Sequence, residues 1–336
     1  MKQAFCILAG MLACSATACD LCAIYRAGDA RGETALGPIF IVAEQYIPYR
    51  TSQVDGEVVY PRNPNYVDSS ITHLVGGYSI SSRFAVSLNV PLTHLSFRRT
   101  DLEYSLTAPP RLFTEQGTEF GLGDLSVIGR FNLLQKMSMS RGYVVNLLAG
   151  VKFPTGNSER LKIEVDQAEI YRELLPPNTP HDPLGHSISS VHQHDLALGS
   201  GSYDGIFGLT ASGRWRRVFL NGQAQYYLRT QGEAGFQYGN EVIISGGPGY
   251  YVFLGESFTV SLQANAVFDW MARDRILGER TNQTGITAWY LGPLVSLTWG
   301  ERLNVNAGID LPLSIENNGY QSVPDFRLYG GVSWRF

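Results

Sequence analysis

The sequence predicts an all-β protein, a transmembrane antiparallel up-and-down β-barrel of about 12 strands. Three observations predict it. Apolar and polar residues alternate with a period of two along most of the chain, short and long connections follow each other in turn, and residues 1–18 have the pattern of an export signal. An even strand count puts both termini on one side of the membrane, which we expect to be the periplasmic side.

The expected export signal is the first element of the chain. Lys2 is followed by an apolar stretch over residues 5–14 and by Ala16-Thr17-Ala18, the small-x-small pattern that signal peptidase accepts. We therefore expect a cleaved signal peptide over 1–18 and a mature chain that begins at Cys19. Lipidation of Cys14 or Cys19 is a less favoured alternative, because neither has the usual Leu three residues before it.

A C-x-x-C pair, Cys19 and Cys22, lies in the segment 19–38, which we expect to be a periplasmic N-terminal segment ahead of a barrel domain at 39–336. In an exported protein a disulfide or mixed disulfide is favoured over metal or redox chemistry. Haem attachment would need His after the second cysteine, where Ala23 stands. The segment is a candidate plug for the barrel, or a docking point for a periplasmic protein partner.

Seven cleanly alternating segments and five weaker ones give the strand count. In the clearest segment, 258–270, every second residue from Phe258 to Trp270 is apolar, and polar residues such as Gln263 and Asn265 lie between them. The clean segments are 84–93, 124–133, 145–153, 218–229, 258–270, 303–311 and 326–336, and the weaker ones are 39–46, 71–80, 205–214, 241–253 and 286–299.

The connections test the count independently, because short turns and long polar loops alternate strictly, as they do in outer-membrane barrels. The short turns are expected at 81–83, 135–141, 214–217, 254–256 and 300–302. The long loops are expected at 50–65, 99–118, 155–203, 231–240, 273–284 and 314–322.

A soluble sandwich or lipocalin-like barrel would also alternate, but three features weigh against it. The export signal excludes the cytoplasm, strands of about ten residues match a tilted bilayer crossing, and aromatic residues lie near the predicted strand ends, where interfacial girdles belong. The chain also stops at Trp334-Arg335-Phe336, which resembles the C-terminal aromatic signature of outer-membrane proteins. We expect the protein in the outer membrane of a Gram-negative bacterium, surrounded by its lipid. The expected girdle aromatics are Tyr226, Tyr227, Trp270, Trp289, Trp299 and Trp334.

Composition excludes other classes. A mean hydropathy of -0.07 without dense apolar blocks excludes a polytopic helical membrane protein. The 22 Arg and four Lys are scattered and the net charge is -4, so the chain has no electrostatic footprint for nucleic acid. There is no G-x-S-x-G, no H-E-x-x-H and no phosphate-binding glycine loop followed by Lys, so we expect neither an enzyme nor a cofactor.

Three segments resemble an exported family named for the meta-cleavage pathway of phenol degradation, a group of outer-membrane proteins with a suspected transport role. They are Gly123-Asp124-Leu125 through Arg130, Val151-Lys152-Phe153-Pro154-Thr155-Gly156, and Leu198-Gly199-Ser200-Gly201-Ser202-Tyr203-Asp204-Gly205. Together with the strand pattern, the resemblance covers most of 84–336. It implies an outer-membrane barrel with a role near the degradation of aromatic compounds. The Cys19/Cys22 pair has no counterpart that we can match in the family pattern.

On the barrel interpretation the polar face of each strand lines the lumen. Acidic and basic residues are mixed there, which predicts weak ion selectivity if the lumen is open and paired, bracing charges if it is not. The predicted lumen-lining residues are Asp124, Arg130, Asn146, Lys152, Gln223, Gln225, Arg229, Gln263, Asn265, Asp269, Asn304, Asn306, Asp310 and Arg327.

The loop 155–203 is too long to be a mere connector. It carries four of the six histidines, His181, His186, His192 and His194, and His192-x-His194 is a plausible start for a zinc, copper or nickel site. A solvated surface loop is the favoured interpretation, and a constriction folded into the barrel is the alternative.

We expect a channel or transporter for the passive passage of small molecules, with aromatic or apolar compounds among them. Two other functions stay open. The barrel could be a scaffold that docks a periplasmic redox partner through Cys19 and Cys22, or a surface metal-binding protein that uses the His-rich loop.

Overall fold

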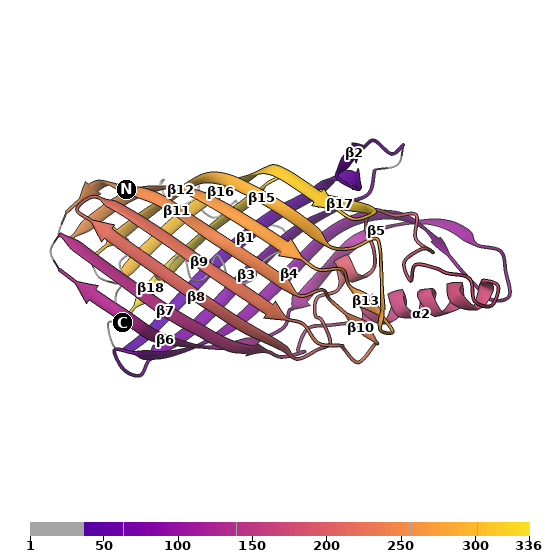
Figure 1. Cartoon of the computed structure of the whole chain (residues 1–336), viewed down its shortest axis with the longest axis horizontal. Helices are drawn as coiled ribbons and strands as arrows, with labels where there is room; N and C mark the ends of the chain where they lie inside the picture. Colours follow the sequence, from indigo (N-terminus) through magenta and orange to yellow (C-terminus); the bar gives the residue numbers. More distant parts are fainter. Residues whose placement is uncertain (1–36, 63, 139, 256, 301) are drawn as a thin grey trace, which may run out of the picture.

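The computed structural model describes residues 37–336 except 63, 139, 256 and 301. Twelve antiparallel strands tilt around one axis and form a closed barrel (Figure 1). The barrel closes because β1 pairs with β3 on one side and with β18 on the other. The predicted fold class and strand count are therefore confirmed. The strands are β1 (Gly37–Val54), β3 (Tyr66–Ser79), β4 (Phe84–Glu103), β6 (Ser126–Met137), β7 (Arg141–Lys152), β8 (Asp204–Trp215), β9 (Val218–Leu228), β11 (Glu241–Leu254), β12 (Phe258–Met271), β15 (Ile286–Trp299), β16 (Leu303–Asn317) and β18 (Arg327–Arg335).

The two faces of each strand follow the alternation of the sequence. In β12, Ser261 and Gln263 are buried, whereas Leu262 between them is 49% exposed. A barrel wall is one layer thick, so a buried side chain faces the interior and an exposed apolar one faces outward. The outer face is apolar, as a lipid-facing surface must be. Trp270, Trp289, Trp299 and Trp334 are exposed on this face, where the girdle aromatics were expected.

Tyr227 corrects one expectation, because it does not lie in an outer aromatic girdle. It is 3% exposed and lies on the inward parity of β9, in step with Gln225. Its hydroxyl donates to Gln225 Oε1 at 3.1 Å, and the Arg229 guanidinium lies 4.8 Å from its ring centroid. Adjacent Tyr226 and Tyr227 cannot share a face, since successive side chains of a strand point to opposite sides.

The connections sort to the two ends of the barrel. The five short turns lie where they were expected, between β3 and β4, β6 and β7, β8 and β9, β11 and β12, and β15 and β16. The Phe336 amide donates to the Pro38 carbonyl at 3.2 Å, so the described ends of the chain meet at this short-turn end. Among residues 37–336 as described, no helix is long and apolar enough to cross a membrane.

Three of the predicted polar loops contain strands that extend the barrel wall. β5 (Arg111–Leu122) pairs with β4 from Leu92 to Glu103, so the loop expected at 99–118 is largely a hairpin that extends the barrel wall. β2 (Glu57–Val59) and β17 (Tyr320–Pro324) pair with the last residues of β1 and extend it in the same way. The β4–β5 hairpin was missed because β5 carries polar residues on both faces, which removes the period-two signal.

The segment 155–203 folds into a compact structure at the long-loop end (Figure 1). It contains α2 (Glu159–Leu174) and the 3-10 turn η1 (His194–Leu196), and it packs beside the small sheet of β10 (Phe236–Gln237), β13 (Arg275–Ile276) and β14 (Glu279–Arg280). We call 155–203 together with this sheet the cap. Its apolar core includes Leu161, Leu184, Phe236 and Ile276.

The cap also enters the barrel. Val191 and Leu196 are fully buried against Leu95 and Phe97 of β4 and Val67 of β3. The favoured interpretation of 155–203 as a solvated loop is therefore wrong for its second half, and the alternative of a segment folded into the barrel mouth is right. Burial of these apolar side chains removes them from water and holds the segment in place.

Candidate functional site

Five charged side chains form a chain of ion pairs at the long-loop ends of neighbouring strands. We call it the charge belt. Lys152 Nζ lies 3.2 Å from Asp124 Oδ2 and 2.7 Å from Asp204 Oδ2, and Arg229 bridges Asp204 at 3.2 Å and Glu241 at 2.8 Å. All five lie at a strand terminus or one to two residues from it, where β6, β7, β8, β9 and β11 meet the cap. Each cation is neutralised by two acids, as buried charges require.

A second group of charges crosses the interior. Arg327 of β18 pairs with Asp269 of β12, although β15 and β16 separate these strands in the sheet. The Arg327 guanidinium lies 3.8 Å from the Tyr290 ring centroid. Asp310 accepts from Asn265 Nδ2 at 2.8 Å and from the Tyr329 hydroxyl at 3.2 Å. These contacts match the bracing arrangement of inward charges that the sequence left open.

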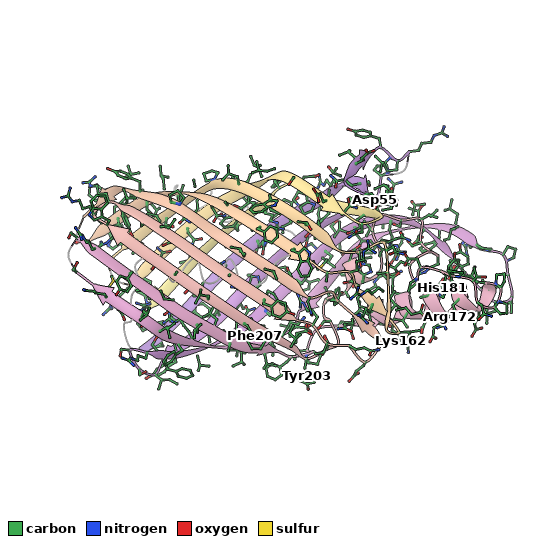
Figure 2. All side chains as sticks on the ribbon, in the orientation of Figure 1. Asp55, Lys162, Arg172, His181, Tyr203 and Phe207 are labelled. Atoms are coloured by element: carbon green, nitrogen blue, oxygen red, sulfur yellow. The ribbon has the colours of Figure 1, made fainter. Side chains whose placement is uncertain are left out.

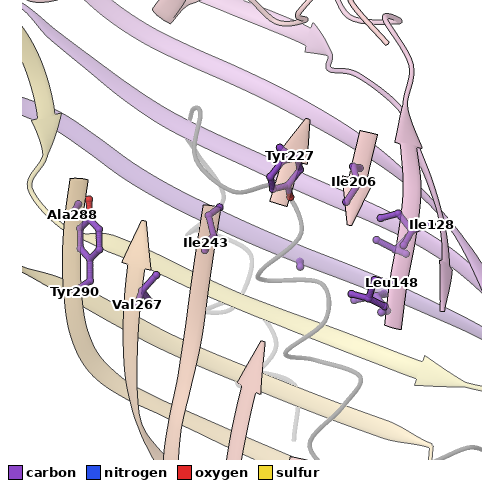
Figure 3. Packing of buried hydrophobic residues seen from close by; sticks show 11 residues of the cluster. Ile128, Leu148, Ile206, Tyr227, Ile243, Val267, Ala288 and Tyr290 are labelled. Atoms are coloured by element: carbon purple, nitrogen blue, oxygen red, sulfur yellow. The ribbon is translucent and has the colours of Figure 1, made fainter. Parts of the chain in front are cut away.

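Beyond the charge belt the interior becomes apolar. Inward side chains from nine strands form one buried cluster, which we call the apolar ring (Figure 3). Along β7 the order toward the cap is Asn146, Leu148 and Lys152, so the ring lies between a polar layer and the charge belt. The members of the ring are Ile41, Ala43, Val75, Ile128, Leu148, Ile206, Tyr227, Ile243, Val267, Ala288 and Tyr290.

Below the ring, toward the short turns, amide and hydroxyl groups line the interior. Asn146 accepts from Asn132 Nδ2 at 3.1 Å and donates to Thr210 Oγ1 at 3.0 Å, which links β6, β7 and β8. Gln223 Nε2 donates to Ser245 Oγ at 2.8 Å in the same way. A cavity of about 50 Å³ lies among these groups. The polar residues thus satisfy one another across strands.

A larger cavity of about 230 Å³ lies between the cap and the apolar ring. Four tyrosines line it, Tyr49, Tyr227, Tyr238 and Tyr290, together with the paired charges of Lys152, Arg229 and Arg327. His194, Asp195 and Leu198 of the cap line it from the long-loop end. Concave, aromatic and partly charged, this cavity has the properties of a small-molecule site.

The three segments that carried the family resemblance meet in one junction, which attaches the cap to the barrel. Asp124 Oδ1 accepts from the Gly156 amide at 3.0 Å, and Asp124 Oδ2 accepts from the Ser200 amide at 2.8 Å and its hydroxyl at 2.7 Å. A Cβ at Gly199 would lie 2.6 Å from Asp124 Oδ1 and from the Gly156 carbonyl carbon, so only glycine lets these backbones approach. Thr155 Oγ1 completes the junction by donating to the Gly123 carbonyl.

Inside the cap, three histidines surround the buried carboxylate of Glu164. His194 Nδ1 lies 3.2 Å from Glu164 Oε2, and His186 Nε2 lies 3.4 Å from Glu164 Oε1. Burial opposes ionisation of Glu164, but the hydrogen bonds with His186 and His194 outweigh it and hold its pKa well below the usual range. Burial also lowers the pKa of His192, with a further contribution from His194.

Two further carboxylates face His194. Its Nε2 lies 3.5 Å from Asp195 Oδ1 and 3.8 Å from Asp274 Oδ2. Burial works to lower the pKa of His194, but Asp195, Glu164 and Asp274 outweigh it and raise this pKa to about 9. Burial raises the pKa of Asp274 to about 6. Three carboxylates therefore surround one imidazole in the cap.

The structure places the predicted site residues as follows. Arg130 and Arg229 are half-buried, and the other predicted lumen-lining residues are buried on the inward face. His186, His192 and His194 are buried together, but His181 is separate, with Nε2 3.8 Å from Glu279 Oε2 (Figure 2). Cys19 and Cys22 lie outside the described residues. The predicted residues found on the inward face are Asp124, Asn146, Lys152, Gln223, Gln225, Gln263, Asn265, Asp269, Asn304, Asn306, Asp310 and Arg327.

Sequence reasoning missed several residues that form the site. Asp204 and Glu241 begin their strands on the inward parity, a signal that was available from the period-two pattern. The apolar ring was missed because an inward apolar residue such as Leu148 or Val267 looks like a break in the polar face. Glu164 and Asp274 had no sequence signal, since they meet the histidines only through the fold of the cap.

The closed twelve-strand wall with an apolar outer face defines an outer-membrane β-barrel. Among solved structures the chain is similar to the COG4313 outer membrane channel from Pseudomonas putida F1, with a TM-score of 0.56 and 14% identity over 92% of this chain and 98% of that chain. This likeness shows the fold, and it confirms the β-barrel that the family resemblance implied.

More distant likenesses were found to two other outer-membrane proteins. The first is the β domain of the Bordetella autotransporter BrkA, with a TM-score of 0.41 and 10% identity over 90% of this chain and 100% of that chain. The second is the translocator domain of the autotransporter NalP from Neisseria meningitidis, with a TM-score of 0.40 and 10% identity over 93% of each chain. Both TM-scores are below 0.5, so these two likenesses say nothing about the function of this chain. No profile of a known protein family and no curated protein sequence matches this chain.

Proposed function

We propose that this barrel is a passive channel for small aromatic or apolar molecules. The observation that carries the proposal is the layering of the interior, where a cavity lined by four tyrosines lies directly above the apolar ring. Tyr227 and Tyr290 belong to both, so a solute in the cavity already contacts the ring.

The size of the cavity fits one aromatic ring. Its volume is about 230 Å³, and a protein cavity of about 150 Å³ is enough to hold benzene. Tyrosine rings offer apolar faces for stacking and hydroxyl groups for a polar substituent of the solute. A phenol-like or benzyl-alcohol-like compound is therefore the best match to this lining.

The charges disfavour the passage of free ions. Lys152, Arg229 and Arg327 are all paired with carboxylates, so an anion would have to break a buried pair to bind. An apolar constriction also repels hydrated ions, because dewetting raises the barrier for charge. The interior thus supports neutral solutes better than inorganic ions. The sequence has no energy-coupling or nucleotide-binding motif, so the proposed transport follows the concentration gradient.

The test is uptake of a labelled monoaromatic alcohol by porin-deficient Gram-negative cells that express the chain. Ile243 of the apolar ring is fully buried and offers a matched pair of variants. Ile243→Asn places an amide in the ring and should reduce uptake several-fold, whereas Ile243→Leu keeps the ring apolar and should leave uptake near the wild-type rate. Heat modifiability on gels checks that each variant forms the barrel.

Two outcomes would contradict the proposal. One is uptake no faster than in cells with an empty vector. The other is equal uptake by the two folded Ile243 variants, which would show that the apolar ring does not lie on the path.

A further inference from the structure

The cap buries a cluster of imidazole and carboxylate groups, in which His192 Nε2 has no hydrogen-bond partner among the described residues. His192 and His194 are 1% and 6% exposed, and they lie within a few ångströms of carboxylates from α2, η1 and the segment before β13. Buried ionisable groups are expensive unless they are paired or coordinate a metal.

The orientation of His194 leaves one ring nitrogen for a ligand. Its Nδ1 lies 3.2 Å from Glu164 Oε2, within hydrogen-bond distance, which leaves Nε2 on the other side of the ring for another partner. A histidine that donates its second nitrogen to a carboxylate in this way is the usual arrangement around metal ions, because the carboxylate sets the tautomer and the ring angle.

Nε2 of His194 then faces Asp195 Oδ1 at 3.5 Å and Asp274 Oδ2 at 3.8 Å. These separations are too long for hydrogen bonds, which span about 2.7–3.2 Å. Ligands at about 2.1 Å from a tetrahedral ion lie roughly 3.4 Å apart. The spacing between Nε2 and Asp195 is therefore closer to that of two metal ligands than to that of a donor and an acceptor.

His192 supplies the independent observation. Its ring stacks on that of His194, with centroids 5.1 Å apart and an interplanar angle of 10°. Its Nε2 is buried and has no hydrogen-bond partner among the described residues, and its Nδ1 lies 3.9 Å from Asp195 Oδ2. One ligand atom from each of His192, His194 and Asp195 lies within 4.8 Å of the other two.

We propose that His192, His194 and Asp195 bind one divalent transition-metal ion of the zinc class, with Glu164 as the positioning residue for His194. Two imidazoles and one carboxylate suit zinc and exclude calcium and magnesium, which prefer oxygen ligands alone. Asp195 is 39% exposed and lines the 230 Å³ cavity, so an ion can reach the site from the lumen. The proposal narrows the predicted set of four histidines, because His181 lies apart and His186 contacts only Glu164 within the cluster.

The site goes beyond the proposed transport function and does not depend on it. A bound ion would hold His192 and η1 in one conformation, and the contact of His194 with Glu164 joins η1 to α2. Failure of aromatic uptake would leave the metal site untouched, and failure of metal binding would leave the channel proposal untouched.

The experiment is a Co²⁺ and Zn²⁺ titration of the full chain, purified from outer membranes in detergent and stripped with a chelator. The visible absorption of bound Co²⁺ reveals its coordination geometry, because tetrahedral sites with nitrogen ligands absorb strongly. We expect one equivalent to bind to the wild type, with displacement by Zn²⁺. Asp195→Asn and His192→Gln should weaken binding at least tenfold, and Glu164→Gln should weaken it by about 10- to 100-fold.

His181→Gln is the matched control, since it removes a histidine of the same loop outside the cluster, and it should bind as the wild type does. Asp195→Asn should disturb folding least, because the side chain at this position is partly exposed. In the wild type the His192 amide donates to Asp195 Oδ2 at 2.7 Å, and the asparagine side chain keeps an oxygen that can accept this hydrogen bond. The proposal is overturned if the wild type binds no stoichiometric Co²⁺, or if Asp195→Asn and His181→Gln bind equally well.

Discussion

Replacing Asp124 with Asn should detach the cap from the barrel without opening the barrel. Asp124 is 6% exposed, accepts three hydrogen bonds from Gly156 and Ser200, and pairs with Lys152 at 3.2 Å. Asparagine has nearly the same shape, but it loses the charge and turns one acceptor into a donor that faces the Ser200 amide. The change thus isolates the electrostatic part of the junction.

The expected magnitude follows from the contacts. Asp124→Asn weakens the two hydrogen bonds from Ser200, and a hydrogen bond to a charged group contributes about 1.5–3 kcal/mol, so the two together contribute about 3–6 kcal/mol. We therefore expect a loss near the lower end, about 3 kcal/mol, in the free energy that holds the cap down. That corresponds to roughly a hundredfold shift in the local opening equilibrium, at 1.4 kcal/mol for each factor of ten.

The assay is amide hydrogen exchange at Gly156 and Ser200, whose N–H groups donate to Asp124. Exchange there should be about a hundred times faster in Asp124→Asn, while amides in β7 and β8 exchange at the wild-type rate. Asp166→Asn, on the exposed face of α2, removes one carboxylate from the same cap and is the control. Equal exchange in the Asp124 and Asp166 variants would refute the assignment of Asp124 as the anchor of the cap.

Two further predictions concern backbone contact and interior bracing. Gly199→Ala should make the cap more sensitive to limited proteolysis, because the new Cβ would lie 2.6 Å from atoms of Gly156 and Asp124. Gly213→Ala is the control, since Gly213 has open space around it, and this variant should be cleaved at the wild-type rate. Equal cleavage of the two variants would contradict the prediction. Arg327→Met should lower the free energy of unfolding of the barrel by about 3–5 kcal/mol, because it leaves the buried Asp269 carboxylate without its Arg327 partner. Adding Asp269→Asn should restore much of that loss in urea unfolding followed by tryptophan fluorescence, and no recovery in the double variant would contradict the bracing role.

Strand positions and side-chain faces could be read from the sequence because both are local properties. The period-two pattern located all twelve barrel strands, and parity alone put residues such as Gln263 and Asp310 on the inward face. The same parity would have placed Tyr227 inside, and treating it as a girdle aromatic ignored its neighbour Gln225. Where polar residues occupied both faces, as in β5, the pattern carried no signal and the hairpin was missed.

The sequence by itself determined the class of fold, the number of strands, the ends at which the chain turns and most of the inward residues. Only the tertiary structure decided which charges pair, that an apolar ring crosses the interior, and that residues 155–203 fold into the mouth of the barrel. The physical reason is that alternation is set by neighbours two residues apart, whereas the Asp124 junction and the contacts of His194 with Glu164 and Asp274 join residues that are tens of positions apart in the sequence. Such contacts depend on barrel closure and on burial, which no single segment of sequence encodes.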